Sequence, residues 1–294
     1  MKRQISFLLC LVTITGPAIA QNASSDELTL KPHPAAQNAP EEKAPENAGG
    51  SADSTELAKK LSNPIADLIS VPFQFNYDEP IGPKDANKYT LNIQPVIPIT
   101  LNQDWNVIVR TIVPVIYQDS IADGIDSRFG LGDTVQSFFF SPKEPTSGGW
   151  IWGVGPVFLW PTATDDILGS QKWGAGPTAV LLKQEHGWTY GVLANQIWSI
   201  AGESDRASVS SMFVQPFLTY TTHTYTTIGI NTESTYDWKT SQWTVPINLT
   251  VSQLVRIGGH PVSFLLGVRE YVESPTGGPD WGMRFQVTLL FPKK

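Results

Sequence analysis

Polar and charged side chains recur at every second position in several long segments of this sequence, and they are its main candidates for chemistry. They alternate with apolar residues, so each segment gathers them on one face. Such groups replace the hydration shell of a solute that crosses a pore, and charged ones bias which solutes enter. The candidate lumen-lining residues are Gln94, Arg110, Gln136, Gln215, Asn231, Glu233, Asn248, Arg269, Arg284 and Gln286.

Three of these residues carry charges that fall close together in the predicted fold. Arg269 and Arg284 lie on neighbouring segments, and Glu233 lies at a similar height two segments away. The three side chains could constrict a pore and select the solutes that enter it. They could equally form an internal salt-bridge cluster that fills a closed barrel. The sequence leaves both interpretations open.

No set of residues predicts catalysis. A barrel hydrolase needs a histidine and a serine at bonding distance, but His186, His223 and His260 fall in short predicted turns, and none has a serine two residues on. There is no phosphate-binding loop or zinc-spaced cluster, and Asp165-Asp166 is more typical of a solvated loop than of a calcium site. We therefore expect no enzyme, with no catalytic, cofactor-binding or metal-binding residues.

The elements that must position the polar residues are long strands. Apolar and polar residues alternate from Tyr89 to Ile99 and again from Trp105 to Tyr117, and a turn at residues 101–104 joins the two runs. Strands of about 11 residues, tilted near 45°, span about 25 Å, which is the height of the apolar band on an outer-membrane barrel. Strands in soluble proteins average about 5 to 6 residues. The hairpin therefore favours a membrane barrel over a soluble β-sandwich.

The same alternation continues to the end of the chain and predicts an all-β fold, a transmembrane antiparallel up-and-down β-barrel of about 12 strands. An even number is expected of a single-chain bacterial barrel with both ends in the periplasm, and the odd-numbered connections should then be the longer, outward ones. Tryptophan and tyrosine near the predicted strand ends are typical of aromatic girdles. The predicted strands are 69–77, 88–100, 105–117, 131–141, 150–160, 172–183, 188–199, 207–221, 225–238, 243–254, 262–273 and 281–291.

The N-terminal part of the chain has a different composition. Residues 1–20 predict a signal peptide, with two basic residues, an apolar run and a small-residue cleavage site. Residues 21–61 predict a disordered periplasmic leader with one or two helical turns at Thr55 to Leu61. We interpret those turns as a tether in preference to a plug in the lumen. Residues 62–294 form the predicted barrel, and no later run of 18 apolar residues offers a transmembrane helix.

A short repeat, W-G-x-G-P, occurs at Trp152–Pro156 and at Trp173–Pro177 on neighbouring predicted strands. With Gly130–Asp133, the hairpin and Gln215–Phe217, the chain resembles a bacterial outer-membrane transporter family over residues 57–291. Its members are labelled as MetA-pathway of phenol degradation proteins, and some carry the name neuromedin U. The resemblance implies passage of small, aromatic or hydrophobic, solutes across the outer membrane of a Gram-negative bacterium. The repeat glycines predict either a thin wall facing the lumen or close strand packing.

We expect an outer-membrane channel or transporter for small solutes. Its expected partners are outer-membrane lipid, a small-molecule solute and the barrel-assembly machinery, whose signal the last strand resembles. The net charge of −7 and the absence of any basic tract give no reason to expect nucleic acid. One alternative is a closed outer-membrane barrel that serves as a scaffold or adhesin. A second is a secreted soluble β-sandwich that binds a sugar.

Overall fold

The computed structural model describes residues 48–292, with side chains from Ser54 onward. This part of the chain contains one helix, α1 (Ala48–Leu61), and a 15-stranded sheet. The strands are β1 (Ile69–Ile81), β2 (Ala86–Ile93), β3 (Val96–Thr100), β4 (Trp105–Gln118), β5 (Arg128–Leu131), β6 (Thr134–Pro142), β7 (Trp150–Trp160), β8 (Lys172–Glu185), β9 (Trp188–Gly202), β10 (Ser210–Thr221), β11 (Thr226–Thr232), β12 (Ser234–Asp237), β13 (Gln242–Ile257), β14 (His260–Glu273) and β15 (Trp281–Phe291).

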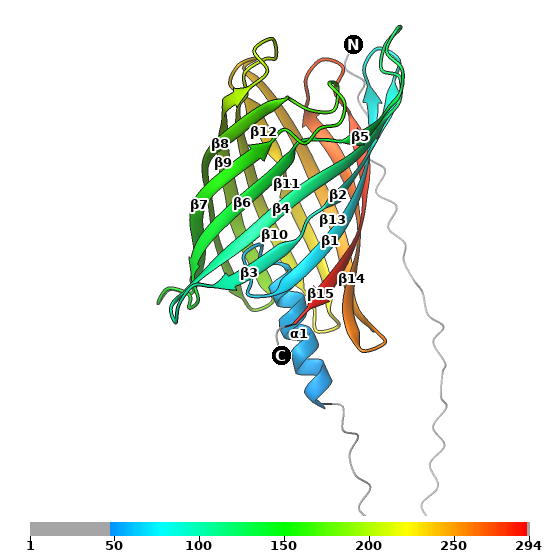
Figure 1. Cartoon of the computed structure of the whole chain (residues 1–294). Coiled ribbons are helices and arrows are strands. Elements are labelled where there is room, and N and C mark those ends of the chain that lie inside the picture. Colours follow the sequence, from blue (N-terminus) through cyan, green and yellow to red (C-terminus); the bar gives the residue numbers. More distant parts are fainter. Residues whose placement is uncertain (1–47, 293–294) are drawn as a thin grey trace, which may run out of the picture. The chain divides into compact units, whose positions relative to one another are not determined.

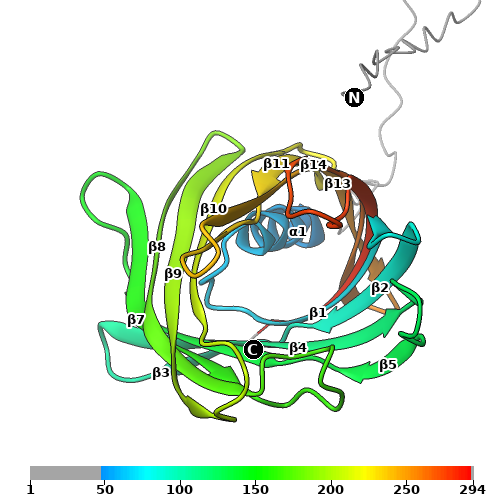
Figure 2. The same cartoon turned by 90° about the horizontal axis from the view of Figure 1, so that it is seen from above.

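These segments form a closed antiparallel barrel of 12 strands (Figure 1, Figure 2). Three of the barrel strands consist of two consecutive segments that share a neighbour: β2 with β3 and β5 with β6 along β4, and β11 with β12 along β13. The ring closes where the first strand, β1, pairs with the last, β15. The prediction of an up-and-down barrel of about 12 strands is confirmed.

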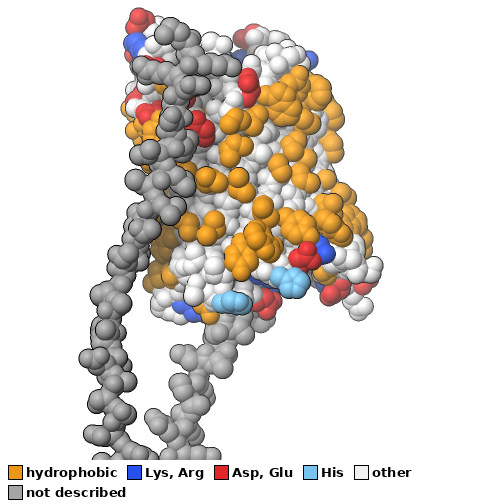
Figure 3. Space-filling view, turned by 180° about the vertical axis from the view of Figure 1, so that it is seen from behind, with side chains coloured by type: hydrophobic (Ala, Val, Ile, Leu, Met, Phe, Trp, Pro, Cys, Tyr) orange, Lys and Arg blue, Asp and Glu red, His pale blue; other side chains and the backbone are white. Residues whose placement is uncertain are grey.

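The outer face of the barrel is apolar. A row of side chains crosses the wall at mid-height, because Val251 lies opposite Leu266, Leu266 opposite Phe285, and Phe285 opposite Phe75. All four are exposed, Leu266 to 60%. Figure 3 shows such hydrophobic side chains spread over one face of the wall. A soluble β-sandwich would bury these residues between two sheets, so the arrangement contradicts that alternative.

Aromatic residues stand near the strand ends, as an interfacial girdle requires. On one side of the barrel, Tyr77, Tyr89 and Tyr117 follow one another on adjacent strands, with ring centroids 5.2 and 6.0 Å apart. At the other end of the strands, Trp188 and Tyr220 pack with centroids 4.9 Å apart. The two groups bracket the apolar wall.

We call the end of the barrel that carries α1 and Phe291 the near end, and the opposite one the far end (Figure 1). The connections at the near end are mostly short, such as Thr222–Tyr225 and the two-residue turns His186-Gly187 and Gly258-Gly259. The far end carries the longer connections 119–127, 161–171, 203–209 and 274–280. This is the asymmetry that the sequence predicted, although β1 and β2 run further than expected and leave only residues 82–85 between them.

The interior holds two apolar clusters. Ile65, in the linker after α1, packs with buried residues of the wall; these are Ile108, Phe139, Val180, Leu182 and Leu193. At the near end, Leu57 and Ala58 of α1 pack against Leu254 and Leu290. Within the described residues no helix is long and apolar enough to cross a membrane.

Helix α1 enters the ring of strands at the near end (Figure 2). Besides the apolar contacts, Arg256 Nε donates to Ser54 Oγ at 3.3 Å, and Gln184 Nε2 donates to the carbonyl oxygen of Lys59 at 2.8 Å. The sequence predicted a flexible tether here in preference to a plug. The helix packs instead because Leu57 and Ala58 supply an apolar stripe that the strand pattern alone could not reveal. The predicted signal peptide and most of the predicted leader, residues 1–47, lie outside the described residues.

Candidate functional site: the polar interior of the barrel

Two arginines and a glutamate form the centre of a polar cluster inside the barrel. Glu233 lies at the break between β11 and β12, where its carboxylate accepts two parallel hydrogen bonds from Arg284, at 2.9 and 2.7 Å. It also accepts one from Arg269 Nη2 at 3.0 Å. This bidentate arginine–carboxylate geometry is the strong and directional form of an ion pair.

The opposite side of the cluster comes from β1. Arg269 Nη1 donates to Asp78 Oδ1 at 3.1 Å, and Tyr271 donates its hydroxyl proton to the same oxygen at 2.8 Å. Arg284 Nε donates to Asn76 Oδ1 at 2.8 Å. The arginine side chains are only 9% and 6% exposed. Two buried cations are thus matched by two carboxylates and by amide and hydroxyl groups, as burial of charge demands.

Two glycines provide room for this cluster. Arg269 lies opposite Gly282 in the sheet, and Arg284 lies opposite Gly267. A Cβ atom at Gly282 would come within 2.6 Å of Asp78 Oδ1. The missing side chain therefore lets the carboxylate of Asp78 on β1 approach the guanidinium of Arg269 on β14 across the intervening strand β15.

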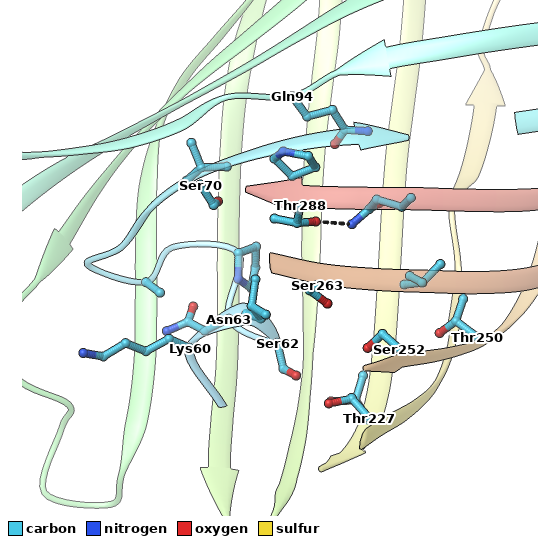
Figure 4. Close-up of a pocket in the computed structure, with 18 of the residues that line it drawn as sticks. Lys60, Ser62, Asn63, Ser70, Gln94, Thr227, Thr250, Ser252, Ser263 and Thr288 are labelled. Atoms are coloured by element: carbon cyan, nitrogen blue, oxygen red, sulfur yellow. Dashed lines mark hydrogen bonds between the residues drawn. The ribbon is translucent and has the colours of Figure 1, made fainter. Parts of the chain in front are cut away.

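A chamber of about 260 Å³ lies inside the barrel between the polar cluster and α1. Serine and threonine side chains from β1, β11, β13, β14 and β15 border it, and the linker after α1 closes it on the near side (Figure 4). Gln286 Nε2 donates to Thr288 Oγ1 at 3.0 Å along its wall. Apolar groups, among them Val96 and Phe217, complete the lining.

Most of the residues predicted to line the lumen do lie on the inner face. The chamber is bordered by Gln94, Arg110, Gln215, Asn231, Glu233, Arg284 and Gln286. Asn248 and Arg269 belong to the polar cluster, since Arg269 Nε donates to Asn248 Oδ1 at 2.9 Å. Asn248 in turn donates to Asn231 Oδ1 at 2.9 Å. Hydrogen bonds therefore connect five of the candidates, which are Asn231, Glu233, Asn248, Arg269 and Arg284.

Gln136 is the exception and requires a correction. It lies opposite Thr111 on β4 and donates a hydrogen bond to the Thr111 hydroxyl at 3.1 Å. Thr111 directly follows the inward-facing Arg110, so Thr111 and Gln136 point to the outer face. On β6 it shares its face with Phe140, which is 42% exposed, so it lies on the outer side of the wall. Three consecutive phenylalanines, at 138–140, hide the alternation of this strand, and for that reason the sequence suggested the wrong face.

Three members of the polar cluster were not singled out from the sequence: Asn76, Asp78 and Tyr271. The sequence does carry a signal for the first of them, because Gln74 and Asn76 alternate with the apolar residues of β1. The predicted strand ends at Tyr77, four residues before the end of β1, so Asp78, the acid that pairs with Arg269, falls in a predicted loop. Tyr271 was classed with the interfacial aromatics because of its type.

The repeat glycines of β7 and β8 pack closely against neighbouring strands. A Cβ atom at Gly155 would overlap the carbonyl oxygen of Phe138, and one at Gly176 would overlap that of Gln196. At these two positions the structure supports close strand packing and not a thin wall that widens the lumen. Within the described part of the chain, no group of three or more His, Cys, Asp or Glu side chains could hold a metal ion.

The fold resembles solved outer-membrane barrels. An outer membrane channel from Pseudomonas putida F1 is 15% identical, with 76% of this chain and 94% of that chain covered and a TM-score of 0.59. The Salmonella typhi outer membrane phospholipase dimer with bound calcium is 11% identical, with 82% and 98% covered and a TM-score of 0.44. No family model and no curated protein matches the sequence. At these identities the similarity establishes the fold alone.

Proposed function

We propose that this protein is an outer-membrane channel for small solutes, with its near end in the periplasm and α1 closing that end. The observation that supports the proposal best is the pairing of an apolar outer wall with a polar chamber inside it. Hydrocarbon accepts the exposed leucines, valines and phenylalanines, while the enclosed amides, hydroxyls and arginines offer a solute replacements for water.

The class of solute follows from the chamber and from the family resemblance. Val96, Phe217 and Leu265 border the chamber beside the polar groups, so a solute with both an apolar and a polar part finds complementary surfaces. The resemblance to transporters labelled for phenol degradation makes small aromatic compounds the first class to test. We propose no catalytic role, because His186, His223 and His260 lie in or beside turns at the near end and not around the chamber.

The role of α1 predicts how the channel responds when the helix is removed. Leu57 and Ala58 anchor it by apolar burial, which for a leucine contributes roughly 1.5–3 kcal/mol. Refolded protein in planar bilayers should therefore show a larger single-channel conductance after deletion of residues 21–61 than after the control deletion of residues 21–47, which spares the helix. Leu57→Asp should reproduce the larger conductance in the full-length chain, because it places a charge in the apolar contact.

Glu56→Gln provides the matched control, since Glu56 is exposed and, among the described residues, forms its ion pair with Lys60 on the same helix. It should leave the conductance unchanged. If neither the full chain nor either deletion conducts, the channel proposal is wrong, and the ion-paired cluster across the lumen then favours the closed scaffold.

A further inference from the structure

We propose that the chamber is a binding site for small carboxylate solutes and that Arg110 is the group that binds the carboxylate. The proposal rests on the channel function proposed above and names the solute class for the same interior. It follows from the balance of charges around the chamber, the bonding of Arg110, and the kinds of group that surround the remaining space.

The cations that border the chamber are Lys60, Arg110 and Arg284. Arg269 and Arg284 pair with Asp78 and Glu233 at 2.7–3.1 Å. Among the ion pairs of the described residues, none includes Arg110, although it borders the same space. Among the described cations that border the chamber, Arg110 is therefore the one that lacks a carboxylate partner; Lys88, which lies opposite Asp78 in the sheet, does not border it.

Within the described part of the chain, the Arg110 side chain makes one hydrogen bond, which holds the guanidinium in place without neutralising its charge. Arg110 Nη2 donates to Gln94 Oε1 at 3.0 Å, which uses one of the five N–H donors of the guanidinium. A neutral amide carries no compensating charge, and a partly desolvated cation without an anion is costly. A carboxylate that enters the chamber can relieve that cost, and its two oxygens match the planar fork of an arginine.

The acidic side chain that borders the chamber does not pair with Arg110. Glu233 also borders the chamber, but both of its oxygens accept hydrogen bonds from Arg284, and one accepts a further bond from Arg269. The other cation on the lining, Lys60, pairs at 2.8 Å with Glu56 on its own helix. A solute carboxylate therefore has Arg110 as its available partner.

The rest of the lining suits the body of a small carboxylate. Gln215 and Gln286 offer amide groups, while Val96 and Phe217 offer apolar contact. The volume of about 260 Å³ limits the solute to a small molecule. Hydroxyl groups of Ser70, Ser252 and Ser263 can hydrogen-bond a carboxylate or the water around it (Figure 4).

The test compares two probes of equal size, butanoate and butanamide, by calorimetric titration of the full-length chain in detergent. The unmodified protein should bind butanoate at least about tenfold more tightly than butanamide, the order expected for a hydrogen bond to a charged group. Arg110→Gln should abolish the preference. Arg128→Gln, which removes an arginine paired with Asp165 at the far end, should retain it.

A second variant keeps the test independent of the folding of Arg110→Gln. Gln215→Glu adds a carboxylate to the chamber wall, and this carboxylate should pair with Arg110 and weaken butanoate binding at least about tenfold. Equal binding of butanoate and butanamide by the unmodified protein, or a preference that survives Arg110→Gln, overturns the proposal. If the protein conducts but does not prefer butanoate to butanamide, only the carboxylate-site proposal is wrong. If it prefers butanoate but does not conduct, only the channel proposal is wrong.

Discussion

At the scale of single residues, the interior is organised by a carboxylate that serves two arginines. Glu233 holds Arg269 and Arg284 from across the lumen, and each of these also reaches β1 through Asp78 or Asn76. Four barrel strands therefore meet in one set of ion pairs and hydrogen bonds: β1, the strand formed by β11 and β12, β14 and β15. Because the participants are largely buried, removal of one partner leaves the others unpaired in a poor solvent for charge.

Glu233→Gln should for that reason destabilise the barrel by about 3–5 kcal/mol, the range found when one member of a buried ion pair is removed. The measurement is denaturant unfolding in lipid vesicles, followed by tryptophan fluorescence. Asp165→Asn is the control, because its pair with Arg128, at 3.2 Å, is about one-third exposed and should contribute only about 0–1 kcal/mol. Equal stabilities of the two variants would contradict a structural role for the cluster.

At the scale of elements, neighbouring strands approach one another so closely at two positions of the W-G-x-G-P repeat that only glycine fits. Gly155 on β7 and Gly176 on β8 each face a backbone carbonyl group of a neighbouring strand. A side chain at either position must push the strands apart and break ladder hydrogen bonds. The W-G-x-G-P repeat therefore reflects the packing of the wall.

Gly176→Val should cost about 3 kcal/mol or more, since the clash is with backbone and cannot be relieved by a rotamer change. Ala179→Val, three positions along the same strand on the exposed outer face, should change the stability by less than about 0.5 kcal/mol. The folded fraction can be measured on a denaturing gel, where unheated folded barrel and boiled unfolded protein migrate differently. A Gly176→Val barrel as resistant as the parent would contradict this account of the repeat.

The strand pattern was readable from the sequence because alternation between an apolar and a polar face is a local property. All 12 strands were located in this way, and nine of the ten candidate lumen residues lie on the inner face, all but Gln136. The failures came where local signals are weak: Phe138–Phe140 obscure which face is which, and the end of β1 was missed. The packing of α1 depends on contacts with β13 and β15, which no local pattern contains.

At the scale of the whole molecule, the barrel has the reverse polarity of a soluble protein, because its outer surface is apolar and its interior carries buried charges. Substitution of exposed residues on the outer face can test whether that face meets water or hydrocarbon. Leu266, in the middle of β14, is 60% exposed, and Ile257, beside the near-end turn, is 56% exposed. In water, either residue would tolerate a charge.

In a membrane the two positions should differ. Leu266→Arg should destabilise the barrel by about 2–4 kcal/mol because it lies near the middle of the apolar band, whereas Ile257→Arg should cost about 0–1 kcal/mol at the interface. Unfolding titrations in phosphatidylcholine vesicles measure both. If the two variants are equally stable, the outer face does not meet hydrocarbon, and the membrane location fails with it.

The linker between α1 and the first strand, residues 62–68, has a kinetic consequence. Helix α1 and the barrel end against which it packs belong to one polypeptide. A detached helix therefore stays at an effective concentration on the order of millimolar near its binding position. Reclosure is then a first-order event that is insensitive to dilution. A free peptide with the sequence of α1, supplied at micromolar concentration, would therefore compete poorly with the tethered helix for this binding position.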